Sequence, residues 1–62
     1  MQIGQTIRLR AYGDEVLQRV VVSEVEDTVY VCMQQEFEAA KADNRAPKCV
    51  GFNRKFIIHA QM

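Results

Sequence analysis

Residues 15–33 read EVLQRVVVSEVEDTVYVCM, and this stretch decides the fold. It is rich in valine and in other β-branched or aromatic residues, which are enriched in strands. Within residues 15–25 apolar side chains occur at both parities, so both faces of the strand are partly apolar. We therefore predict a long second strand that bends or carries a bulge, which is typical of a small sheet that curls into a barrel.

The same stretch predicts a tight connection and a third strand. Glu26 and Asp27 can join two strands, although the pair lacks the glycine that two-residue hairpins prefer. Residues 28–33 follow as a strand in which Val29 and Val31 share one face. The stretch as a whole thus predicts an antiparallel pair of strands.

A helix is predicted directly after this pair. Residues 34–44 are rich in Gln, Glu, Ala and Lys, which are good helix formers. Met33, Phe37 and Ala40 fall on one apolar stripe at helical spacing, and Pro47 prevents the helix from continuing. We predict one helix of about three turns.

Shorter strands are predicted on either side. Residues 3–12 alternate between apolar and polar side chains, and Gly13 with Asp14 marks the turn that follows. After the helix, residues 48–52 and 56–60 predict two more strands, the first with a glycine that suggests a bend or close packing.

The order of these elements is β-β-β-α-β-β, within a single domain over residues 1–62. The fold class is mainly β with one short helix, because five short strands joined by tight turns suit a nearly closed barrel. We predict a small five-stranded SH3-like or Sm-like barrel. The alternative is a three-stranded sheet with a helix packed across it.

Length and composition limit the class of protein. A chain of 62 residues is marginal in stability, and self-association is one common remedy. The longest apolar run is three residues, far below the roughly 20 of a membrane span, and the first residues do not resemble a signal peptide. We therefore expect a cytoplasmic protein with no membrane partner and with reduced thiols.

Charge is unevenly distributed although the net charge is zero. All eight acidic residues lie between Asp14 and Asp43, a stretch with only two basic residues. The two ends hold six basic residues and no acidic one: Arg8, Arg10, Arg45, Lys48, Arg54 and Lys55. Such a chain can pair with copies of itself through opposite charges, so a homo-oligomer, a dimer or higher, is the predicted partner state.

Soft metal ligands are few. Cys32, Cys49 and His59 are the candidates, and their spacing lacks the close pairs of a structural zinc site. Both cysteines are interpreted as small buried strand residues. We predict no cofactor, no metal site and no catalytic residue, and therefore a protein that is not an enzyme.

The candidate surface for a partner or for nucleic acid consists of basic and aromatic residues near the two ends. Its members are Arg8, Arg10, Tyr12, Arg54 and Lys55. In SH3-like barrels the first and last strands tend to meet, which would bring these residues together. Basic side chains beside an accessible aromatic are the elements of a surface that binds single-stranded nucleic acid.

A second interpretation competes with that surface. Arg8 and Arg10 can instead form cross-strand ion pairs with Glu15 or Glu24 of the second strand. The zero net charge also argues against nucleic acid, because such modules usually carry an excess of basic residues.

The second half of the chain resembles a group of short uncharacterised bacterial proteins. The resemblance rests on Tyr30-Val31-Cys32, Glu36, Ala40, Pro47 and Val50-Gly51-Phe52. In that pattern a proline follows the Gly-Phe pair, and here Asn53 stands instead. The resemblance implies a stand-alone bacterial domain and brings no activity with it.

Three classes of function remain open from the sequence. The first is a non-catalytic binding or interaction module that self-associates. The second is a nucleic-acid-binding small β-barrel. The third is an enzyme whose site forms only on oligomerisation.

Overall fold

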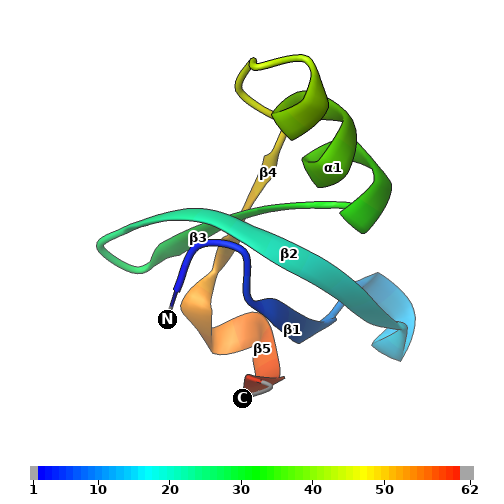
Figure 1. Cartoon of the computed structure of the whole chain (residues 1–62). Helices are drawn as coiled ribbons and strands as arrows, with labels where there is room; N and C mark the ends of the chain where they lie inside the picture. Colours follow the sequence, from blue (N-terminus) through cyan, green and yellow to red (C-terminus); the bar gives the residue numbers. More distant parts are fainter. Residues whose placement is uncertain (1, 61–62) are drawn as a thin grey trace.

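The computed structural model describes residues 2–60, and within them one curled antiparallel sheet carries one α-helix (Figure 1). The elements in chain order are β1 (Thr6–Arg10), the 3-10 turn η1 (Tyr12–Asp14), β2 (Val16–Val25), β3 (Thr28–Cys32), α1 (Gln34–Ala42), β4 (Val50–Asn53), the 3-10 turn η2 (Arg54–Phe56) and β5 (Ile57–Ala60). The strand order in the sheet is β4-β3-β2-β1-β5. The predicted mainly β protein with one helix and five strands is confirmed, and the three-stranded alternative is wrong.

β2 is the strand on which the two halves of the sheet meet. Its first half pairs with β1, with Leu17 opposite Leu9, and its second half pairs with β3, with Val21 opposite Val31. The register shifts between Val21 and Ser23, which places the predicted bulge in the middle of the strand. Figure 1 shows β2 running across the molecule, from the turn after β1 to the hairpin into β3. The bulge raises the local twist and lets one strand serve both halves.

The hairpin between β2 and β3 turns at Glu26 and Asp27, as predicted, and does so without glycine. Glu26 adopts a left-handed conformation with a φ of 54°, which costs free energy for a residue with a Cβ. Arg54 compensates from η2: its backbone N–H donates to the Asp27 carbonyl at 2.7 Å, and its Nη2 donates to the Glu26 carbonyl at 3.2 Å. Arg54 also forms an ion pair with Glu24, so it clamps the turn from outside.

The main core fills the concave side of the sheet. Its five fully buried members come from three strands: Ile7, Leu9, Val21, Val29 and Val31. Phe52 of β4 and Ile57 of β5 pack against them and close the two ends of the sheet over the core. The shared face predicted for Val29 and Val31 is therefore the inner face.

A smaller apolar layer lies on the other side of β2, under α1. Val20 points away from the main core, since successive side chains of a strand face opposite ways. It is buried together with its cross-strand partner Cys32 and with Ala40 of α1. Of the predicted helix stripe, Ala40 is buried and Phe37 half-buried, whereas Met33 lies just before the helix and is mostly exposed.

Several boundaries differ from those predicted. The first strand begins at Thr6 because Gly4, with a φ of 90°, turns the chain before it. The helix ends at Ala42, and Asn44 takes the left-handed conformation just beyond it. Gly51 is explained by close packing, as predicted, because a Cβ there would lie 3.0 Å from a ring carbon of Tyr30. In residues 2–60 no helix is long and apolar enough to cross a membrane.

We predict that Val29→Ala lowers the free energy of unfolding by about 2 kcal/mol, because it leaves a cavity in the main core. Val25→Ala is the matched control, since Val25 is 56% exposed next to the same hairpin and its truncation leaves no cavity. Urea denaturation of both variants measures the difference. Equal effects of the two substitutions would contradict the position of the core.

Candidate functional site

An apolar hollow with aromatic walls lies between η1 and the end of the chain that carries β4 and η2. Its volume is about 360 Å³. We call it the aromatic groove, and it is lined by Arg10, Ala11, Tyr12, Gly13, Asp14, Phe52 and Phe56. Three of these seven residues are aromatic, and they come from three separate elements.

Tyr12 lies on the tight turn η1 and is exposed to solvent. Gly13 and Asp14 both adopt left-handed conformations, with φ of 78° and 63°. The N–H of Ala11 donates to the carbonyl of Glu15 at 2.6 Å and closes the turn. The Tyr12 side chain on this turn is fully exposed, an unusual position for a large aromatic residue. Its ring is free to contact a ligand on both faces.

The opposite wall is built by η2. The Asn53 side chain accepts a hydrogen bond from the backbone N–H of Lys55 at 2.9 Å and caps the turn. Phe56 remains 41% exposed, and the ammonium of Lys55 lies 5.5 Å from the centre of its ring. This distance is within the range of a cation–π contact, so Lys55 sits at the edge of the groove without lining it.

The five residues of the predicted surface fall into different environments. Arg10 and Tyr12 line the groove, and Lys55 lies beside it over Phe56. Arg54 points elsewhere and holds the hairpin turn. Arg8 is half-buried on β1, two positions before Arg10 and on the same face of the strand.

The first and last strands do meet, as predicted, because β5 pairs with β1 and places Ile57 opposite Leu9. The predicted cross-strand ion pairs of the two arginines are wrong. Arg8 lies opposite Gln18 and Arg10 opposite Val16. Among the described residues the ion-pair partner of Glu24 is Arg54, and the Nε of Arg8 is buried without a hydrogen-bond partner.

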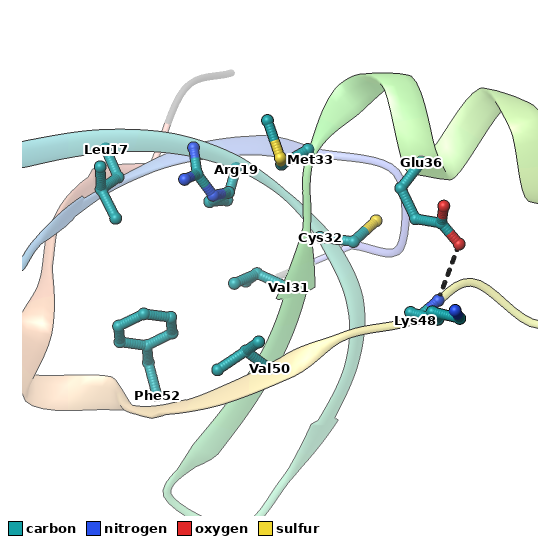
Figure 2. A pocket seen from close by; sticks show the side chains of 9 residues that line it. All are labelled: Leu17, Arg19, Val31, Cys32, Met33, Glu36, Lys48, Val50 and Phe52. Atoms are coloured by element: carbon teal, nitrogen blue, oxygen red, sulfur yellow. Dashed lines mark hydrogen bonds between the residues drawn. The ribbon is translucent and has the colours of Figure 1, made fainter.

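A second hollow opens on the concave side of the sheet, where β2 and β4 do not pair (Figure 2). Its volume is about 350 Å³. We call it the trough, and it is lined by Leu17, Arg19, Val31, Cys32, Met33, Glu36, Lys48, Val50 and Phe52. Figure 2 shows Leu17 and Phe52 on opposite sides of this opening. Phe52 therefore forms a wall of both the trough and the aromatic groove.

Glu36 fixes one end of the trough. Its carboxylate accepts a hydrogen bond from Arg45 Nη1 at 2.7 Å and another from the backbone N–H of Lys48 at 3.0 Å. These two hydrogen bonds, the one from Arg45 foremost, lower the pKa of Glu36, and the hydrogen bond between the two side chains raises the pKa of Arg45. The network ties the segment after α1 back onto the helix.

The two cysteines differ in exposure. Cys32 is buried and Cys49 is exposed, so the expectation that both are buried is wrong for Cys49. Burial, followed by the proximity of Glu36 and Cys49, raises the pKa of the Cys32 thiol. Within the described residues no three metal-ligating side chains come together. The side chain of His59 lies outside the described part of the chain.

No family model, curated protein or solved structure matches this chain.

Phe52 and Phe56, two aromatic residues that line the groove, are not among the five residues of the predicted surface. A usable signal was present, because the two phenylalanines flank a basic turn and an aromatic ring beside a basic residue marks many binding surfaces. What the sequence could not provide is the return of this segment to η1, which depends on the pairing of β5 with β1.

We predict that Glu36→Gln makes the stability of the protein less dependent on pH in the acid range. The folded-state pKa of Glu36 lies below its ordinary value of 4.5, so its stabilisation is complete above that value and is lost as pH falls through the folded-state pKa. The melting temperature, measured from about pH 7 to about pH 3, should therefore fall less steeply in the variant. Glu38→Gln removes the same charge from the same helix and should keep the wild-type slope; equal slopes in both variants would refute the role of Glu36.

Proposed function

We propose that the chain is a non-catalytic interaction module of the SH3-like or Sm-like small-barrel type that self-associates through the aromatic groove. The observation that carries this proposal is the full exposure of Tyr12 opposite the partly exposed Phe56. The fold assignment is supported by two features. One strand, β2, is shared by both halves of the sheet, and a 3-10 turn precedes the last strand.

The surface of the monomer is larger than expected and carries many apolar residues, which supports a contact with a second copy. It exposes 4642 Å², whereas a compact monomer of this mass is expected to expose about 4,100 Å². Eight large apolar residues of the described part of the chain are notably exposed: Ile3, Tyr12, Val16, Val25, Met33, Val50, Phe56 and Ile58. A second copy that covers part of this surface would supply the burial that a short chain lacks.

The groove has the composition of an interface centre. Tyrosine and arginine are enriched among the residues that dominate binding energy, and Tyr12 and Arg10 stand next to each other here. Its lining residues, all within the described chain, include one carboxylate, that of Asp14, and neither a thiol nor an imidazole. This composition suits the burial of a partner's side chains better than the activation of a nucleophile.

Charge supports a second copy as the partner. Arg10 lies opposite Val16 at the start of β2, and the exposed Glu26 and Asp27 follow its end. Two copies related by a two-fold axis, with their β2 strands antiparallel, can place Arg10 of each near the hairpin of the other. Both contacts then form at once, which favours a closed dimer.

We predict that wild-type protein sediments as a dimer and that Tyr12→Ala weakens the dimer by about 2 kcal/mol. This corresponds to a dissociation constant about 30-fold higher. Sedimentation equilibrium over a range of concentrations measures both constants. Met33→Ala is the control, because Met33 is 56% exposed and belongs neither to the groove nor to the hairpin. A wild-type protein that stays monomeric at high concentration overturns the proposal.

Single-stranded nucleic acid is the second candidate ligand, and the observation in its favour is the position of Lys55 over Phe56. Stacked bases between Tyr12 and Phe56 would leave their phosphates near Lys55 and Arg10. Asp14 in the groove opposes this ligand, because its carboxylate repels phosphate. The self-associating module is therefore the first proposal.

If nucleic acid is the ligand, a fluorescent oligodeoxythymidine should bind at low salt and be released as salt is raised. Lys55→Ala should then lower the slope of log affinity against log salt by about one. Lys41→Ala on the exposed side of α1 is the matched control and should leave the slope unchanged. Fluorescence anisotropy gives both slopes, and absence of binding at low salt excludes this candidate.

A further inference from the structure

The two cysteines are brought into register by the pairing of β3 with β4. Tyr30 lies opposite Gly51, and Val31 lies opposite Val50. In an antiparallel pair the next step along one strand meets the previous residue of the other. Cys32, the last residue of β3, is thereby placed opposite Cys49, the residue just before β4.

This placement suits a covalent bond. Opposed residues of antiparallel strands have Cα atoms about 4.5 to 5.5 Å apart. A disulfide needs Cα atoms about 4.4 to 6.8 Å apart, so the strand spacing fits it without a large backbone shift. Opposed side chains also leave the sheet on the same face, and Figure 2 shows the Cys32 side chain directed away from that of Val31.

We propose that Cys32 and Cys49 form a reversible cross-strand disulfide when the protein meets a peroxide, and that this pair is a redox modification site of the chain.

The difference in exposure sets the order of steps. Cys49 is the exposed thiol, and its thiolate attacks one oxygen of hydrogen peroxide; the O–O bond breaks, water is released and a sulfenic acid remains on Cys49. The Cys32 sulfur then attacks the Cys49 sulfur, the S–O bond breaks and a second water leaves. The two thiols are oxidised by two electrons and the peroxide is reduced to two waters.

Cys32 is suited to the second step and not to the first. It is buried under α1, beside Val20 and Ala40, and is far less exposed to peroxide than Cys49. Its raised pKa keeps the thiol protonated at neutral pH and makes it a poorer first nucleophile than Cys49; in the second step its proton leaves with the hydroxyl of the sulfenic acid as water. The exposed partner therefore senses the oxidant, and the buried partner resolves the intermediate.

The disulfide would restrain the chain at one end of the trough. It closes the chain segment that contains α1 into a loop and fixes the approach to β4 beside Lys48, whose N–H already binds Glu36. Cys32 and Lys48 both line the trough, so oxidation would make this end of it rigid. Closing such a loop also restricts the unfolded chain and stabilises the folded one.

The test is to treat the native protein with hydrogen peroxide and then block the remaining thiols with a maleimide. We expect a monomer that has lost two hydrogen masses, carries no maleimide and yields one Cys32–Cys49 peptide after non-reducing digestion. Dithiothreitol should restore both thiols. The melting temperature of the oxidised monomer should exceed that of the reduced protein by about 10 °C.

Cys49→Ser is the matched control, since an exposed serine at this position does not disturb the packing. In this variant the same treatment should leave the Cys32 thiol protected until urea unfolds the chain. The proposal is overturned if wild-type Cys49 proceeds to sulfinic acid or to an intermolecular disulfide while Cys32 stays a thiol. It is equally overturned if the Cys32–Cys49 peptide forms only in urea.

Discussion

The burial of β2 on both of its faces is the constraint on which the rest of the structure depends. Val21 faces the main core and Val20 faces the layer under α1, and both are almost completely buried. One strand thus joins both halves of the sheet and both apolar layers. Because a chain of 62 residues has little apolar material, concentrating it around one strand leaves the other strands short.

The bulge in β2 and the tight hairpin were predictable from sequence because they depend on local patterns. Valines at both parities indicate a strand buried on both faces, and a β-rich run on either side of Glu26 and Asp27 indicates a hairpin. The clamp by Arg54 was not predictable in the same way. Its partners lie more than twenty positions away in the chain, and a basic residue in a turn has no local signature of the hydrogen bonds it makes.

The candidate site also combines residues that local sequence identifies with residues whose surroundings depend on distant strands. Arg10 and Tyr12 were selected as a basic and an aromatic residue near one end of the chain, and both line the groove. Arg8, two positions away, was selected on the same grounds and is half-buried instead. The two arginines share a face of β1, but β5 pairs alongside Arg8 and not alongside Arg10. Sequence distance is therefore a good guide within one strand end and a poor one across the sheet.

Phe52 shows why a curled sheet of this size does not separate packing from binding. The same ring packs against the main core, forms a wall of the trough and forms a wall of the aromatic groove. A ligand that displaces this ring from one hollow must change the shape of the other, since tightly packed interiors adjust through neighbouring side chains. In a larger domain a separate layer of residues would insulate the two hollows. Here Phe52 alone lines both hollows, so the two candidate surfaces share this side chain as their support.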